Sequence, residues 1–593
     1  MGCSDSKASI AAGALQSSAN LLGIATPVAK EDSLASLIDN DQSGEAELSE
    51  ADIERCLAEM PDDYIRKTLD QSVNLTIVIV DAVARDFARY PPSFNRSYAT
   101  LRFAQPPKMK QIAVDGKIII QLPDDDEDAS DMLMVGRALL CLVQKLPLDD
   151  RAPYTESPKH SLAMLAESPL MRLLPTAGSV WPELHSDRAL VRIAFCGMLQ
   201  YYMQGVDKCK APCEVPAGSV ACIDFSDMVD LPVRAGFETM GACAFFGGDG
   251  PDADRRTLLA IWWSHSNRLV LPGDGEWEHA KFAFKGCYPA RVAVVEHLSH
   301  THWTVANGAT SAARIALGPT HPLRRFLRPF CFRSAKINDM AAQALLPECG
   351  FVHRAISLDY QGLCTLLGRG LGSWRYLPFP AFVASKGLPP DVERSLPMVE
   401  DGLELWAVLS KFTAAFVDVF YESDAALLAD GEACHYWDVL DASPEGRTYG
   451  LPRLNVESAK ATLAEHLTHH VFTVSAVHEM VGNTVELLTD DRGFAGKVRP
   501  GEERIDAQAY IQMLCLTAMT SMRMPLLKDC GWGAVYEGSD RISQRQLAAM
   551  ADALGHLKVA LAALESTIEK RNEGRQQPFN GCNPKMLECS VSV

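Results

Sequence analysis

The sequence predicts a mainly α-helical protein with one large helical domain behind two short N-terminal segments. The chain has 593 residues, and 47% of them are hydrophobic, which is enough to bury a large core. Apolar residues recur at spacings of three and four in stretches such as 401–421 and 541–570, as on the buried face of a helix. Alternating patterns typical of strands are few. We therefore divide the chain into residues 1–30, 31–60 and 61–593.

The charge and the cysteines restrict the choice of partners. The net charge is −19, and a chain of this sign repels phosphates, so no nucleic acid is expected as a partner. The seventeen cysteines show no repeated short spacing. Cys209 and Cys213 are the nearest approach to a pair, and no second pair of the kind that zinc sites use accompanies them. The cysteines are therefore interpreted as reduced thiols of a cytoplasmic protein, with no thiolate cluster.

The first residues, MGCSDSK, place Gly2 behind the initiator Met, with Cys3 beside it and Ser6 downstream. This pattern is typical of N-myristoylation with a neighbouring palmitoylated thiol, and two acyl chains give stable attachment to a membrane surface. We expect a peripheral protein on the cytosolic face of a membrane. Residues 8–29 suit a flexible spacer or, alternatively, a transit peptide to an organelle such as a plastid. No apolar run long enough to span a membrane is expected, because Lys411 and Asp418 interrupt the best candidate, 405–421.

The segment DNDQSGEAELSE resembles the calcium-binding loop of an EF-hand. Alternate oxygen ligands can converge on one Ca2+, Gly44 permits the sharp turn at the sixth position, and the last glutamate can chelate with two oxygens. A helix-turn-helix that binds no ion is the alternative, and no second loop follows. The expected calcium ligands are Asp39, Asp41, Ser43, Glu45 and Glu50.

Histidines gather in two short segments that have helical patterns. One holds His297, His300 and His302, and the other holds His466, His469, His470 and His478. Single histidines on such helices are usually structural, but two dense groups on separate helices favour a metal held between them. Iron suits imidazole ligands. His466 and His470 lie two turns or more from His478 and are interpreted as structural or solvent-facing.

Several blocks of sequence share the order and spacing of one enzyme family. The blocks LAIWWSHSNRLVLPGDGEWEHAKFAF, EHLSHTHW, THPLRRFLRP and KIND follow one another and contain Trp277, Lys281, His321 and Pro322. DGLELW follows at 401–406, with Asp424, Asp430 and Trp437 behind it, and VFTVSAVH ends on His478. The tail reads RNEGRQQP and then SVSV, and SFNRSYATLRFAQPP near Phe94 is a weaker match. Together these blocks resemble the lipoxygenases over roughly residues 90–593.

The resemblance implies a fold, a cofactor and a reaction. It implies a large multi-helix catalytic domain, here without the usual N-terminal β-barrel, because no β-rich stretch of suitable length precedes residue 90. It implies one non-haem iron per chain, in addition to the Ca2+ that the EF-hand-like loop predicts. The substrates would be a polyunsaturated fatty acid and O2: a hydrogen atom leaves a doubly allylic CH2 group, and O2 adds to the pentadienyl radical on the opposite face. The iron ligands that the resemblance implies are His297, His302, His478, Asn483 and the C-terminal carboxylate of Val593.

Two registers are open for the first pair of iron histidines, which the family separates by four residues on one helix. The ungapped register puts Val292 and His297 at these positions, and valine cannot ligate a metal. The second register takes His297 and His302. Residues five apart on an α-helix point about 140° apart, so either pair requires a π-bulge. After His478, the family's asparagine position falls on Gly482, with Asn483 one residue later.

Three functions are therefore compatible with the sequence. The first is a fatty-acid dioxygenase at a membrane surface, with possible regulation by Ca2+. The second is a catalytically impaired lipid-binding or scaffold protein on the same fold, which Val292 favours. The third is a hydroperoxide isomerase that uses the same site.

Overall fold

The computed structural model describes residues 107–123 except 115 and 117, 147–149, 185–250, 253–442, 450–482, 496–503, 526–528 and 535–591. Several predictions fall outside these residues and stay predictions: the segment boundaries at 30 and 60, the absent β-barrel, the block near Phe94, the acylation signal at Gly2 and Cys3, the calcium loop 39–50, and the ligands Asn483 and Val593.

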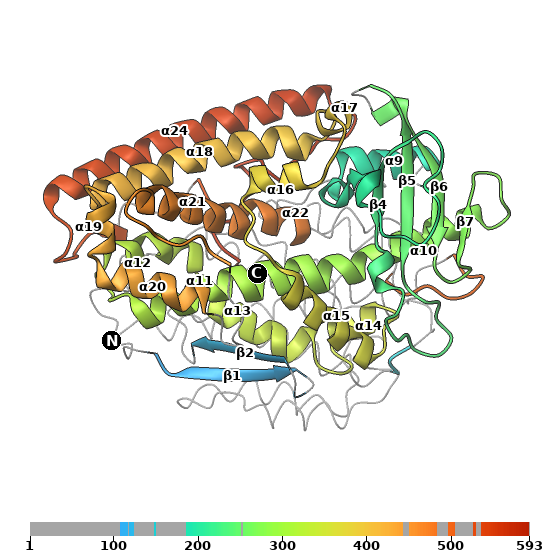
Figure 1. The fold of residues 1–593 in the computed structure, drawn as a ribbon, viewed down its shortest axis with the longest axis horizontal. Coiled ribbons are helices and arrows are strands. Elements are labelled where there is room, and N and C mark those ends of the chain that lie inside the picture. The colour runs from blue at the N-terminus through green and yellow to red at the C-terminus, as the bar shows by residue number, and fades with distance from the viewer. Residues whose placement is uncertain are drawn as a thin grey trace, which may run out of the picture.

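The predicted mainly helical architecture is confirmed in the described residues (Figure 1). The longest helices, α18 (Pro397–Phe420) and α24 (Gln544–Gly574), lie side by side along the top of the view, and α21 (Ala459–Phe472) packs against α18. A five-stranded sheet stands at the right of the view, and the antiparallel hairpin of β1 (Met109–Val114) and β2 (Ile118–Pro123) lies at the bottom. The other α-helices are α9 (Asp187–Cys196), α10 (Trp277–Arg291), α11 (Asn307–Ala316), α12 (Pro322–Leu327), α13 (Ser334–Met340), α14 (Phe351–Ala355), α15 (Tyr360–Ser373), α16 (Phe379–Ser385), α17 (Pro390–Glu393), α19 (Asp424–Leu428), α20 (Gly431–Asp441) and α22 (His478–Gly482).

Two predicted helical stretches, 401–421 and 541–570, correspond to α18 and α24. The helix α24 begins with a capping box formed by Ser543 and Gln546, which satisfies two backbone N–H groups at its start. Its buried residues follow spacings of three and four, as helix packing requires. They are Met550, Ala553, Leu554, Leu557, Leu561, Leu564 and Ile568.

The five-stranded sheet was not predicted. Its strands are antiparallel in the order β3 (Gln204–Gly205), β4 (Ser219–Asp224), β5 (Ala242–Gly248), β6 (Arg256–Trp263) and β7 (Arg268–Val270). The central strands are buried on both faces, so their sequences read as continuous apolar runs instead of alternating ones. One face packs against α9 and α10 in the main core, and the other carries a second, smaller apolar cluster.

One expectation about membranes needs correction. Among the helices that the structure describes, α24 is long and apolar enough to span a membrane by length and composition alone. A helix of a soluble protein can pass the same test, and here the buried residues of α24 pack toward α18. At its C-terminal end, Arg571 bridges to Asp401 and Glu404 of α18 at 2.9 and 2.5 Å. The helix is therefore docked on its neighbour.

Candidate metal centre

The centre of the molecule is a long π-helix. Helix α10 continues without a break into η6 (Val292–Ala306), whose backbone carbonyls bond to N–H groups five residues on. Three hydroxyl side chains follow the same spacing and donate to the carbonyl oxygens five residues earlier. Ser299 donates to Val294 at 2.6 Å, Thr301 to Glu296 at 2.8 Å, and Thr304 to Ser299 at 2.7 Å. These side-chain hydrogen bonds have the spacing of the π-helix and stabilise it.

The π-helix brings His297 and His302 together. Five residues make slightly more than one π-helical turn, so both rings project from one face, and their Nε2 atoms lie 3.0 Å apart. Of the two registers open from the sequence, this is the geometry of the second. Val292 lies at the start of η6, is 1% exposed and belongs to the apolar core.

His478 reaches the same point from a separate segment. Helix α21 continues into a short π-helix, η9 (Thr473–Val477), and then into α22, of which His478 is the first residue. Its Nε2 atom lies 3.2 Å from that of His297 and 3.1 Å from that of His302. Three imidazole nitrogens from two helices therefore converge on one point, as the two histidine groups in the sequence indicated.

Hydrogen bonding assigns the tautomer of His302. Asn338 of α13 donates through Nδ2 to the carbonyl of His302 at 3.0 Å, so its Oδ1 is an acceptor. That oxygen lies 3.0 Å from Nδ1 of His302, which must then carry the proton. Burial lowers the pKa of His302 to about 4, although the bond to Asn338 opposes the shift. The ring is therefore neutral at physiological pH and presents its Nε2 lone pair to the cluster.

A carboxylate stands behind His478. Glu588 is buried, and its Oε2 lies 4.0 Å from Nδ1 of His478, on the side of the ring away from the cluster. This separation is too long for a hydrogen bond, so the carboxylate acts on the ring through its negative charge. Neither Glu588 nor Asn338 was identified as a site residue from the sequence, although Asn338 lies in the quoted KIND block.

The spacing of the nitrogens fits a metal with several open positions. With metal–nitrogen bonds of about 2.1 Å, neighbouring ligands lie about 3.0 Å apart at a 90° angle and about 3.4 Å apart at the tetrahedral angle. The observed separations of 3.0–3.2 Å are closer to the first arrangement. Three nitrogens on one face of an octahedron leave the opposite face for other ligands, as in facial sites of non-haem iron. The donor set therefore fits iron or a related divalent ion.

Gly482 lies against this cluster. A Cβ atom at this position would stand 3.2 Å from Nε2 of His297, so any side chain would crowd the nitrogen that faces the metal position. The chain tail is also fixed nearby in the core. Ser590 donates to the carbonyl of Phe332 at 2.8 Å, and Val591, the last described residue, is fully buried. The predicted ligands Asn483 and Val593 each follow one of these described segments.

The remaining histidines of the two groups stay outside the cluster. His466 and His470 are 1% and 0% exposed, so the solvent-facing alternative is wrong for both. Nε2 of His466 lies 3.2 Å from the hydroxyl of Tyr436. Nε2 of His300 lies 3.0 Å from the carbonyl of Gly370 on α15, which packs closely on the π-helix. His466 and His300 therefore connect neighbouring helices instead of facing the cluster.

Other motif residues also act as supports. Trp277 Nε1 and Lys281 Nζ both donate to Oδ1 of Asp187, at 2.9 and 2.7 Å, and so fasten α10 to the start of α9. His321 and Asp430 come from two separate sequence blocks, yet their side chains meet at 2.9 Å. Burial opposes ionisation of Asp430, but the bond to His321 and further bonds lower its pKa to about 2.

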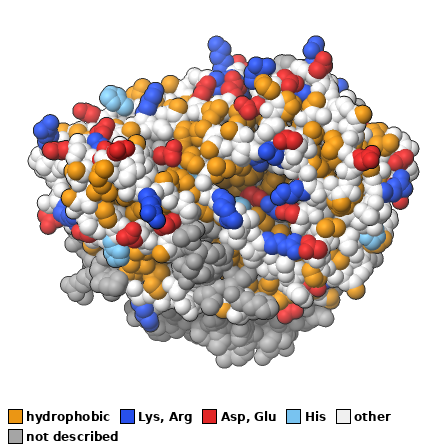
Figure 2. All heavy atoms as spheres, viewed as in Figure 1, with side chains coloured by type: hydrophobic (Ala, Val, Ile, Leu, Met, Phe, Trp, Pro, Cys, Tyr) orange, Lys and Arg blue, Asp and Glu red, His pale blue; other side chains and the backbone are white. Residues whose placement is uncertain are grey.

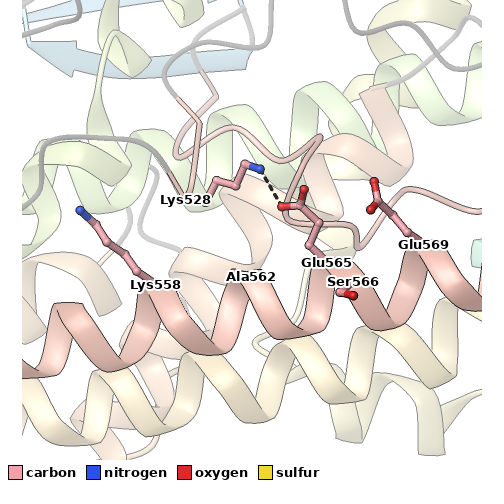
Figure 3. A pocket seen from close by; sticks show the side chains of 6 residues that line it. All are labelled: Lys528, Lys558, Ala562, Glu565, Ser566 and Glu569. Atoms are coloured by element: carbon pink, nitrogen blue, oxygen red, sulfur yellow. Dashed lines mark hydrogen bonds and ion pairs between the residues drawn. The ribbon is translucent and has the colours of Figure 1, made fainter.

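The surface has two hollows. The face in Figure 2 is hollowed near its middle, with hydrophobic side chains on the walls and charged ones around the rim. A separate open depression of about 560 Å3 lies along α24 (Figure 3). Its lining includes Lys528, whose Nζ bonds to Glu565 at 2.6 Å, and contains none of the clustered histidines. It is a feature of the outer helix surface.

Comparison with known proteins agrees with this description. Residues 273–484, which contain all three clustered histidines, match the lipoxygenase family model. The chain is 24% identical to the linoleate 9/13-lipoxygenase of Pseudomonas aeruginosa over 349 residues, which is 55% of this chain and 50% of that protein. It is 24% identical to the human hydroperoxide isomerase ALOXE3 over 357 residues, which is 55% of this chain and 47% of that protein. The chain thus spans about half the length of these curated relatives.

Solved structures show the same fold at low sequence identity. A coral 8R-lipoxygenase superposes with a TM-score of 0.62 and 17% identity, over 82% of this chain and 79% of that one. The manganese lipoxygenase of Gaeumannomyces graminis superposes with a TM-score of 0.60 and 16% identity, over 84% of this chain and 97% of that one. The predicted lipoxygenase-type helical fold is therefore confirmed for the described residues.

Proposed function

We propose that this chain is a non-haem iron dioxygenase that inserts O2 into polyunsaturated fatty acids and forms hydroperoxides. The observation that carries the proposal is the convergence of His297, His302 and His478 within a lipoxygenase-type fold. The family match over residues 273–484 and the two named relatives support an oxidoreductase of this kind.

The proposed iron ligands are these three histidines, with Asn483 and the carboxylate of Val593 completing the set. When bound, iron supplies the one-electron chemistry that removes a hydrogen atom from a doubly allylic CH2 group. The chain itself contributes neutral imidazoles, fixed by partners such as Asn338, and apolar surroundings that exclude water. Because His302 supplies the nitrogen that the ungapped register lacks, Val292 is no obstacle to metal binding in this proposal.

Activity on linoleate tests the proposal. The purified chain should consume O2 and produce conjugated-diene absorbance, and His302→Ala should abolish both because it removes one of three imidazoles. His300→Gln is the matched control, since His300 lies on the same π-helix and bonds to Gly370 instead of facing the cluster. The proposal is refuted if the metal-loaded parent does not oxygenate linoleate or arachidonate and does not decompose their hydroperoxides. Only a lipid-binding role would then remain.

A second candidate activity is the isomerisation of fatty-acid hydroperoxides. The similarity to the hydroperoxide isomerase ALOXE3 favours it, because that relative matches over nearly as long a stretch as the linoleate lipoxygenase. The two activities separate in one assay. An isomerase should consume added hydroperoxide without O2 uptake, whereas a dioxygenase should consume O2 with the unoxidised acid. Both outcomes require the histidine cluster.

For the N-terminal region we propose acylation at Gly2 and Cys3 and binding of Ca2+ by the loop 39–50. Together they would bring the catalytic domain to the cytosolic face of a membrane, where its substrates are released. The coral 8R-lipoxygenase is described as calcium-activated through a C2-like domain, and an 11R-lipoxygenase of the same fold as calcium-dependent. Here the loop would serve the same purpose by a different module. Glu50→Gln, which removes the bidentate carboxylate, should weaken Ca2+ binding in calorimetry.

A further inference from the structure

A cluster of thiols lies on the outer face of the five-stranded sheet. Cys222 is on β4 and Cys243 on β5, and the register pairs Cys222 with Phe245 and Asp224 with Cys243. Alternate residues of a strand share a face, so both thiols point to the same side. That side belongs to the smaller apolar cluster, with Phe245 and Trp262, and is opposite the face that packs on α9 and α10.

A third thiol is supplied by the loop that crosses this face. Cys209 directly follows the short helix η3 (Val206–Lys208), and its sulfur lies within 4.8 Å of those of Cys222 and Cys243. The Sγ atoms of Cys209 and Cys243 are 3.7 Å apart. The sequence contains these residues in three separate segments, which is why no thiolate cluster was expected. That expectation is wrong.

The separation of the sulfurs distinguishes between two kinds of thiol site. A disulfide requires about 2.05 Å between the sulfur atoms. A tetrahedral metal with metal–sulfur bonds of about 2.3 Å places its ligands about 3.8 Å apart. The distance of 3.7 Å between Cys209 and Cys243 agrees with the edge of such a tetrahedron.

The carboxylate of Asp224 holds the loop that carries Cys209 against the sheet. One carboxylate oxygen of Asp224 accepts from the backbone N–H groups of Lys210 and Ala211 at 2.6 and 3.2 Å, and the other accepts from the N–H of Ser226 at 2.9 Å. The carboxylate therefore fixes the loop that follows Cys209 and is occupied by hydrogen bonds. Cys213, four residues after Cys209, packs against the same cluster.

We propose that Cys209, Cys222 and Cys243 bind a soft divalent cation of the zinc class, with Cys213 as the fourth ligand. The cation would clamp the loop 206–218 onto the sheet and so stabilise the region that packs on α9 and α10. This cysteine site is separate from the histidine cluster in ligand chemistry and in position, since the cysteines lie on the face of the sheet opposite α9 and α10. Thiolates select zinc, whereas imidazoles and carboxylates suit iron.

Metal analysis of the full chain tests this site. After dialysis against Zn2+ and removal of the excess, the parent should retain about one zinc per chain. Cys222→Ser should retain less than about a tenth of that amount and keep the parent's iron content. Cys434→Ser is the matched control, because Cys434 is a partly buried cysteine on α20 outside the cluster. Co2+ in place of Zn2+ should give the intense sulfur-to-cobalt absorbance of a tetrahedral thiolate site.

A second measurement on the parent alone covers the case in which the variant fails to fold. Zinc should protect Cys209 and Cys213, the two partly exposed cysteines of the site, from alkylation, and a chelator should make them reactive again, as peptide mass spectrometry can show. The proposal is overturned if these two thiols react equally with and without zinc. It is also overturned if Cys209 and Cys243 form a disulfide in protein purified under non-reducing conditions, or if zinc follows the histidine variants instead of Cys222→Ser.

Discussion

Asn338 and His302 hold each other by two hydrogen bonds in opposite directions. The amide nitrogen of Asn338 donates to the carbonyl of His302, and the amide oxygen accepts from its ring, each at 3.0 Å. Both residues are buried, and they join the π-helix η6 to α13. The pair fixes both the orientation and the protonation of one ring in the cluster, so the amide should matter for the metal without touching it.

Asn338→Leu keeps the approximate volume of the side chain and removes both hydrogen bonds. We expect the metal affinity to fall by about 10–100-fold, because the His302 ring can then turn and change tautomer. Competition with a chelator measures this affinity. Asn307→Leu is the control, since it removes another buried amide, which bonds to the carbonyl of Gln121 on the hairpin. Equal losses of metal in the two variants would contradict the assigned role.

Gly482→Ala tests the space beside His297. Alanine favours a helix over glycine by about 1 kcal/mol, so the change alone should not unfold α22. The added methyl group, however, would stand 3.2 Å from Nε2 of His297 and push the ring away from the other two. We expect a lower metal content at unchanged helicity by circular dichroism. Gly372→Ala on α15 meets no atom within 4 Å and should keep its metal. Full metal content in Gly482→Ala would contradict this prediction, because the His297 ring would then accommodate the methyl group without loss of the metal.

The sequence predicted parts of the fold and site well, and others not at all. The periodicity of α18 and α24 was visible because each helix buries one face, while β5 and β6 are buried on both faces and have no alternation. The histidines were found because they are dense in the chain. The roles of Asn338 and Glu588 depend on contacts across 36 and 110 residues, and no local pattern marks such pairs.

The ion pair of His279 and Glu238 should make stability depend on pH. Nε2 of His279 lies 2.8 Å from Glu238, both side chains are buried, and this hydrogen bond raises the pKa of His279 although burial opposes it. Since the pKa is higher in the folded state, the contribution is fully present below about pH 6.5 and is lost as pH rises through the raised value. Glu238→Gln should therefore lower Tm more at pH 6 than at pH 9.

Glu278→Gln provides the comparison for that series. Glu278 is an exposed neighbour on the same helix that pairs with Lys281 at 2.7 Å, and this pair contains no histidine. Its effect on Tm should be small and nearly constant over this range. A Glu238→Gln effect that is equally constant would contradict the assignment of the pH dependence to His279.

Gly2→Ala tests the proposed membrane anchor. Myristoylation requires the glycine, and palmitoylation of Cys3 usually follows it, so one substitution should remove both acyl chains. The parent should sediment with membranes, and the variant should remain in the supernatant. Ser4→Ala, which lies beside the motif without supplying its glycine, cysteine or Ser6, should behave like the parent. Identical fractionation of parent and Gly2→Ala would remove the basis for the anchor.

The metal content of three purified proteins tests most directly whether the histidine cluster is a catalytic metal site. The parent should contain close to one iron or manganese ion per chain. His478→Ala should lose nearly all of it, because only two imidazoles remain, and a chain extended by one residue beyond Val593 should lose a large part, because an amide carbonyl would replace a carboxylate ligand. A parent without either metal after loading, or a His478→Ala protein that keeps its full complement, would contradict the site and the enzyme proposed from it.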